Sequence, residues 1–123
     1  MAILTEGKHA GGFLVWESFS DYTRETVTIA SRAGKLEPGS VLGKITAGGK
    51  YTRLAPAATN GSQNPAGILW AGVDATAADA PSVVILRGPA IVNRHEIVWP
   101  EGATEAQITA GTTALAALGI VLR

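Results

Sequence analysis

A proline–glycine turn at Pro38–Gly39 is the feature that most constrains the fold of this sequence. Proline fixes one backbone dihedral of a type II turn, and the glycine after it accepts the positive φ that the turn requires. The turn divides the sequence: residues 1–33 are rich in Thr, Ser, Gly and charge, whereas nearly all residues that could form a core come later. We therefore expect one domain, with its core built from the part after the turn.

Short apolar runs on both sides of the turn have the length of β-strands. Residues 26–30 alternate strictly, so Val27 and Ile29 should face the core while the threonines face solvent. Residues 41–46 and 50–54 flank a Gly-Gly pair and predict a β-hairpin. Further strands are expected at 66–73, 82–87, 90–93, 96–99 and 120–122, with loops at 55–65 and 74–81.

One helix is expected, close to the end of the sequence. Thr104 and Gln107 have the spacing of a capping box. Gly119 stands where a helix stop belongs, and Gly111 inside the helix costs about 1 kcal/mol relative to alanine. One face of the helix carries Ile108, Leu115 and Leu118. The sequence therefore predicts a mainly-β fold with one short helix near its C-terminus.

Composition excludes several classes of partner. Ten basic and ten acidic residues cancel, so the chain lacks the cationic excess that drives most nucleic-acid binding. No run approaches the ~20 apolar residues of a membrane span, and Met1–Thr5 does not resemble a secretory signal. Only 16% of residues are charged while 46% are hydrophobic. Such a surface is either neutral but soluble or buried against other subunits.

A search for catalytic or metal-binding groups is mostly negative. The chain has no cysteine, and its two histidines, His9 and His95, lack metal-ligand spacing. Asp74 and Asp79 flank a loop but lack the dense alternating carboxylates of a calcium site. The Gly-Gly-Lys run at 48–50 joins two strands rather than opening a helix, which argues against a phosphate cradle. We expect no enzymatic activity, cofactor, metal or small-molecule substrate.

The N-terminal segment combines glycines with an apolar strip. Gly7, Gly11 and Gly12 make residues 1–12 expensive to order, which predicts a mobile terminus. The strip at 13–19 has two interpretations. It is either an edge strand folded onto the core, which the residues alone slightly favour, or a docking peptide that adds to the sheet of a partner.

Several motifs follow one another in the order and spacing of a known family. They are Glu-Thr-Val-Thr-Ile-Ala at 25–30, Leu-Glu-Pro-Gly-Ser-Val-Leu-Gly at 36–43, Ala-Gly-Ile-Leu at 66–69, Val-Asp at 73–74 with Ala-Asp at 78–79, Val-Ile-Leu-Arg-Gly-Pro-Ala at 84–90, and the closing helix with Gly-Ile at 119–120. Over residues 22–123 the sequence resembles the head decoration proteins of tailed bacteriophages, of which the phage lambda decoration protein is a member.

This resemblance implies a structural protein of the virion, made in the cytoplasm of the bacterial host. Members form homotrimers on the outer surface of the expanded capsid, at three-fold and quasi-three-fold positions, and reinforce the shell. It implies a β-clip-like domain over residues 21–123 and a flexible N-terminal arm over residues 1–20 that joins a sheet of the major capsid protein. The arm residues expected to bind the capsid are Phe13, Leu14, Val15, Trp16 and Phe19. Residues 2–20 should then be dispensable for folding but required for attachment.

Two other functions are consistent with parts of the sequence. A small peptide- or carbohydrate-binding module would use Trp16, Trp70 and Trp99 as an exposed platform, although the last two lie in apolar runs typical of a core. A small hydrolase would depend on His95 and a nucleophile converging with it. The exposure of the tryptophans and the surroundings of His95 distinguish these possibilities.

Overall fold

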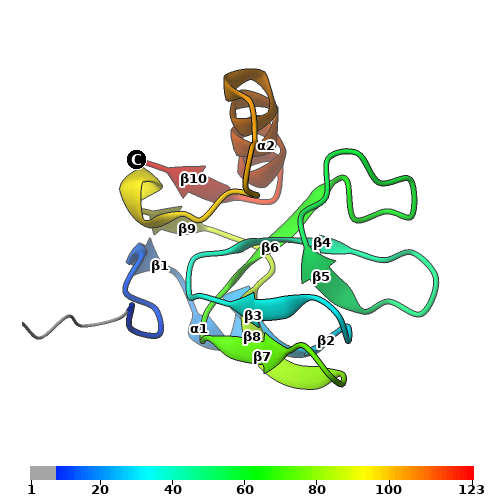
Figure 1. Cartoon of the computed structure of the whole chain (residues 1–123). Helices are drawn as coiled ribbons and strands as arrows, with labels where there is room; N and C mark the ends of the chain where they lie inside the picture. Colours follow the sequence, from blue (N-terminus) through cyan, green and yellow to red (C-terminus); the bar gives the residue numbers. More distant parts are fainter. Residues whose placement is uncertain (1–7) are drawn as a thin grey trace, which may run out of the picture.

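The computed structural model describes residues 8–123 and shows a mainly-β protein with a helix of 13 residues near the C-terminus, which confirms the predicted fold class. A closed barrel of five strands lies beside a layer formed by a three-stranded sheet and that helix (Figure 1). The strands are β1 (Leu14–Glu17), β2 (Arg24–Ile29), β3 (Gly34–Leu36), β4 (Val41–Lys44), β5 (Tyr51–Arg53), β6 (Pro65–Leu69), β7 (Val73–Ala75), β8 (Ala80–Ile85), β9 (Ala90–Val92) and β10 (Ile120–Leu122). The helices are α1 (Ser20–Thr23), the 3₁₀ turn η1 (Arg94–Glu96) and α2 (Glu105–Ala117).

The barrel has the strand order β2-β5-β4-β6-β8. Its longest ladder is antiparallel and runs from the pair Arg24↔Ile85 to the pair Ile29↔Ala80, which confirms the strand predicted at 26–30. β4 and β5 form the predicted hairpin. β2 and β5 meet in parallel at one residue pair, Ile29↔Tyr51, and this contact closes the barrel.

Three barrel strands bury both of their faces. Successive side chains of a strand point to opposite sides, so adjacent apolar residues on β4, β6 and β8 reach two different cores. One core fills the barrel, and the other lies between the barrel wall and the three-stranded sheet. The barrel core takes Leu42, Leu69 and Val84, and the second core takes Val41, Ile68 and Ile85. This double burial explains why these strands appear in the sequence as continuous apolar runs.

The layer outside the barrel joins distant parts of the chain. β9 is the middle strand, with β1 antiparallel on one side and β10 parallel on the other. We call β1, β9, β10 and α2 the terminal layer. Its core side carries Phe13, Ala90, Val92, Leu115, Ile120 and Leu122. Phe13, Ile29 and Leu36 are also buried, so the expectation that nearly all of the core follows Pro38–Gly39 is wrong for these three residues.

The turn at Pro38–Gly39 has the predicted form. Gly39 has φ +92°, and the backbone N–H of Ser40 donates to the carbonyl of Glu37 over 3.2 Å. A Cβ on Gly39 would lie 2.5 Å from the carbonyl oxygen of Glu96, so this position needs glycine for space as well as for its dihedral. The turn carries the chain from the small β3–β7 sheet into the barrel.

Helix α2 begins and ends where the sequence predicts. The capping box is present: the side chain of Thr104 accepts from the N–H of Gln107, and the side chain of Gln107 accepts from the N–H of Thr104. Gly119 follows the helix with φ +88°. Gly111 is buried, and a Cβ there would lie 2.5 Å from the ring of Trp99. The glycine inside the helix therefore admits an aromatic ring.

Other strand predictions are wrong in detail. The strand predicted at 66–73 ends at Leu69 as β6 of the barrel, whereas β7 occupies the start of the loop predicted at 74–81 and pairs with β3 in a separate sheet. Residues 96–99 do not form a strand with named partners: η1 covers the first of them, and Val98 makes one isolated bridge with Ser40. The short elements α1 and β3 were not predicted, because three- and four-residue elements have little periodicity of their own.

Candidate functional site

Residues 8–12 contact the rest of the domain at Trp70 and Glu37. The N–H of Gly11 donates to the carbonyl of Trp70 over 3.0 Å, and a Cβ on Gly11 would overlap the indole ring. The ammonium of Lys8 lies 3.8 Å from the carboxylate of Glu37. The prediction of a mobile terminus over 1–12 falls partly on residues 1–7, which lie outside the described residues.

Phe13 anchors the apolar strip in the core between barrel and terminal layer. Its side chain is 2% exposed, and its ring meets Trp70 edge-to-face with centroids 6.1 Å apart. Its carbonyl accepts from the N–H of Asn93 over 2.8 Å. Full burial of a Phe side chain stabilises by about 1.5–3 kcal/mol. Of the two interpretations of residues 13–19, the edge strand folded onto the core describes Phe13 and β1.

A polar cluster behind β1 fixes the same strand from its other end. The Glu17 carboxylate forms an ion pair with Arg24 and accepts a hydrogen bond from the Thr23 hydroxyl over 2.7 Å. The Arg24 guanidinium lies 3.5 Å from the centroid of the Trp70 ring, a cation–π geometry. Glu17 was not predicted as a structural residue. The available signal was a single carboxylate interrupting an otherwise apolar strip.

A β-bulge turns two consecutive apolar side chains of β1 outward. Leu14 lies opposite Val92 of β9, and Trp16 lies opposite Ile91. The chain therefore advances by two residues on β1 but by only one on β9, and the register shifts. A bulge of this kind breaks the alternation of a strand. Val15 is 62% exposed and Trp16 is 52% exposed. Sequence alternation alone would have placed one of them inside.

Trp16 belongs to an apolar row across the outer face of the three-stranded sheet. Ile91 on β9 lies between Trp16 on β1 and Val121 on β10, and directly opposite residues share a face. Val121 is exposed, and Phe19, just before α1, is 78% exposed. We call Val15, Trp16 and Phe19, together with Ile91 and Val121, the outer apolar face.

The five residues expected to bind a partner are therefore not equivalent. Phe13 is buried and Leu14 is half-buried, whereas Val15, Trp16 and Phe19 are exposed. Residues 13–19 are thus anchored in the core through Phe13 and present Val15, Trp16 and Phe19 to solvent. Whether this surface binds a partner stays a prediction.

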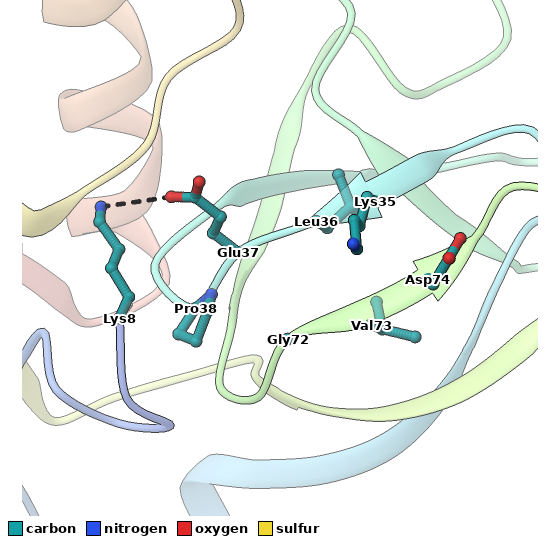
Figure 2. Close-up of a pocket in the computed structure, with 8 residues that line it drawn as sticks. All are labelled: Lys8, Lys35, Leu36, Glu37, Pro38, Gly72, Val73 and Asp74. Atoms are coloured by element: carbon teal, nitrogen blue, oxygen red, sulfur yellow. Dashed lines mark ion pairs between the residues drawn. The ribbon is translucent and has the colours of Figure 1, made fainter. Parts of the chain in front are cut away.

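An open groove of about 660 Å³ lies beside the β3–β7 sheet (Figure 2). Leu36, Pro38 and Val73 supply its apolar part. The Lys8–Glu37 pair stands at one end, and Lys35 lies opposite Asp74 at the other. The groove brings together no nucleophile with a general base.

Asp74 and Asp79 serve the loops in which they stand. Hydrogen bonds from the side chain and backbone of Thr76 lower the pKa of Asp74. The pKa of Asp79 is also lowered, chiefly by the hydrogen bond from the Lys50 ammonium and then by the N–H of Ser31. Among the described residues no cluster of three His, Cys, Asp or Glu side chains could hold a metal ion.

The residues that the two alternative functions would use do not come together in one site among the described residues. Trp70 packs against the core between Phe13 and Arg24, and Trp99 packs against Gly111, so Trp16 alone of the three is exposed. His95 is exposed beside Trp99 and Glu105 in a shallow groove. Threonines of α2 line the same groove, and the hydroxyls of Thr112 and Thr113 donate to the backbone carbonyls of Ile108 and Thr109. A tryptophan platform is therefore absent from residues 8–123.

Within the described residues no helix is both long and apolar enough to cross a membrane. Residues 3–120 match the model of the family described as bacteriophage lambda head decoration protein D. No curated protein matches the chain.

Proposed function

This chain belongs to the bacteriophage lambda head decoration protein family, and we propose that it binds the outside of the expanded capsid as a homotrimer and stabilises the shell. The family is structural and forms part of the phage head. The proposed sites are the three-fold and quasi-three-fold positions of the capsid, and the proposed partner is the major capsid protein. Synthesis in the host cytoplasm would precede attachment.

The observation that carries this proposal is the outer apolar face. Two bulky residues of β1 are exposed side by side because a bulge breaks the alternation, and Phe19 adds a third. Exposed aromatic and aliphatic groups of this size are typical anchors of protein interfaces. The capsid contact is thus assigned to Val15, Trp16 and Phe19, while Phe13 holds the strand in place.

We further propose that β1 binds the capsid without leaving its own domain. Release of the strand would expose Phe13, at about 1.5–3 kcal/mol, and would separate Glu17 from Arg24. Binding in place keeps these contacts and still presents the outward side chains. Three such faces on one trimer would add their binding energies through avidity.

Co-sedimentation with mature, decoration-free capsids tests the attachment. Trp16→Ser and Phe19→Ser should each reduce the bound fraction strongly at unchanged melting temperature. Tyr22→Ser is the matched control, because Tyr22 is also exposed but stacks beside Arg87, with the guanidinium 5.1 Å from its ring centroid. Equal capsid binding by all three variants would refute the assigned contact. Sedimentation equilibrium of the unmodified protein tests the trimer, which a monomer at micromolar concentration would exclude.

A disulfide lock separates binding in place from binding by release. Leu14 and Val92 are directly opposite, and such pairs have Cα separations of about 4.5–5.5 Å, within the range of a disulfide. Because the chain has no cysteine, Leu14→Cys with Val92→Cys adds one defined bridge. Oxidised and reduced forms should bind capsids equally. Binding by the reduced form alone would show that β1 must detach.

A further inference from the structure

The seam that closes the barrel is incomplete. Among the described residues β2 pairs with β8 along its whole length but with β5 only at Ile29↔Tyr51. The preceding part of β2 therefore has a neighbour on one side only. A groove of about 430 Å³ opens there, lined by residues 25–28 of β2 and by Gly48–Tyr51 of the hairpin, which projects from the barrel (Figure 1).

The register shows which backbone groups face this groove. In an antiparallel ladder, residue pairs alternate between hydrogen-bonded and non-hydrogen-bonded. The N–H of Leu86 donates to Thr23, which makes that pair hydrogen-bonded and the pairs of Thr26 and Thr28 with β8 non-hydrogen-bonded. Thr28 lies opposite Pro81. Proline has no N–H to donate, so its place in a non-hydrogen-bonded pair agrees with this assignment. The N–H and C=O of Thr26 and the N–H of Thr28 therefore point away from β8.

The charges around the groove favour an anionic group. Glu25 is paired with Arg87 over 2.7 Å, and Lys50 is paired with Asp79 over 2.5 Å. Lys44 has no carboxylate within ion-pair distance among residues 8–123, and its ammonium lies 5.8 Å from the centroid of the Tyr51 ring. The one positive charge left without an ion partner at this edge is therefore that of Lys44.

We propose that this seam is a strand-addition site for an extended, acidic segment of a partner protein. The segment would hydrogen-bond through its backbone to Thr26 and Thr28, and a carboxylate side chain of the segment would meet Lys44. An open strand edge pairs with extended peptide in this way, and side-chain contacts then select the sequence. Asp79 holds the hairpin by accepting from Lys50 and from the N–H of Ser31, so the groove is preformed. This site is separate from β1 and does not depend on the proposed capsid contact.

The probe is an acetylated, amidated hexapeptide of alternating valine and glutamate, titrated into ¹⁵N-labelled full-length protein. Saturable shifts are expected at the amides of Thr26 and Thr28, and the same peptide with lysine in place of glutamate should bind at least tenfold more weakly. Lys44→Glu should reverse that preference. Failure to shift these amides at millimolar peptide, or an unchanged preference in Lys44→Glu, would overturn the proposal.

A backbone variant separates strand addition from simple charge attraction. Thr26→Pro removes an N–H that the β2–β8 ladder does not use, so affinity should fall at least tenfold while the melting temperature stays within a few degrees. Thr26→Val keeps the N–H, loses only the hydroxyl and should bind normally. If Thr26→Pro unfolds, its loss of binding carries no information. The proposal then depends on whether Lys44→Glu reverses the preference between the glutamate and lysine peptides. Concentration-dependent shifts at Thr26 without peptide would identify a second copy as the occupant and refute the proposal.

Discussion

The barrel and the terminal layer have the same kind of apolar core but are assembled from different distances along the chain. The five barrel strands lie between Arg24 and Ile85, where β4 and β5 form a hairpin and β2 pairs with β8 at the other end of the segment. The terminal layer brings β1 together with β9 and β10, which come more than seventy residues later. The comparison teaches that a segment can look like a loose arm in the sequence because its partner strand lies far away. Four perturbations test how far the two regions differ.

Deletion of residues 2–20 should have the largest effect. It removes Phe13 and all of β1, so the core between the barrel and the terminal layer loses one wall. Because Phe13 is buried, we now expect residues 2–20 to be needed for folding, which is the opposite of the prediction from the sequence. Amide hydrogen exchange should accelerate in β9 and β10 while β2 and β8 stay protected. Deletion of residues 2–7 is the control, and an unchanged melting temperature in the longer deletion would restore the interpretation as a free arm.

Phe13→Ala isolates the anchor from the rest of the strand. Loss of a buried Phe side chain costs about 3–5 kcal/mol through lost burial and the cavity left behind. Phe19→Ala removes the same group from an exposed position and should change the free energy of unfolding by less than about 0.5 kcal/mol. Urea denaturation measures both variants. Equal destabilisation would mean that Phe19 is also buried, against the structure.

Gly111→Ala tests the packing of α2 against Trp99. Alanine improves helix propensity by about 1 kcal/mol, but its Cβ would collide with the Trp99 ring, and overpacking costs about 1–3 kcal/mol. We expect a net loss of about 1 kcal/mol in thermal or urea unfolding. Addition of Trp99→Leu should remove most of the penalty from the Gly111→Ala step. A stabilised single variant would show that the ring moves aside freely.

Asp79→Asn should have the smallest effect, a loss of stability that is present at neutral pH and disappears in acid. The pKa of Asp79 is lowered in the folded state, so its contribution is present above the ordinary value of 3.8 and is lost as pH falls through the folded pKa. The variant should therefore show a shallower loss of stability with acid, measured as melting temperature against pH. Asp74→Asn is the comparison, because Asp74 is bonded within its own loop to Thr76. Parallel acid profiles for Asp79→Asn and the unmodified protein would exclude this role.

The elements that the sequence predicts well are those with local signals. β2 alternates within one strand, the β4–β5 hairpin has its glycines between two apolar runs, and α2 carries its own capping box at Thr104 and Gln107. The family motifs likewise lie along the barrel and α2. Each of these signals is complete within about fifteen residues, so no distant partner is needed to interpret it.

The features that the sequence could not resolve depend on pairing between distant segments. β7 lies at the start of a predicted loop because it pairs with β3, and nothing in its own three residues specifies that partner. The exposure of Trp16 depends on a bulge against β9, and the burial of Phe13 depends on Trp70. The open edge at Thr26 becomes visible only when the register of β2 with β8 and β5 is known. For the candidate site, the apolar composition of residues 13–19 identified the segment, but it did not predict which side chains are buried and which are exposed.

The position of β1 has a consequence for synthesis on the ribosome. The strip around β1 is translated before the barrel, yet its partner β9 emerges only after every strand of the barrel has been made. During that interval the edge of an apolar strand stays unpaired, and such edges are aggregation hazards. Glu17 interrupts the strip, and Asp21 and Arg24 follow closely, so charged residues accompany the nascent segment. The carboxylate that later pairs with Arg24 thus also protects the chain before any barrel exists.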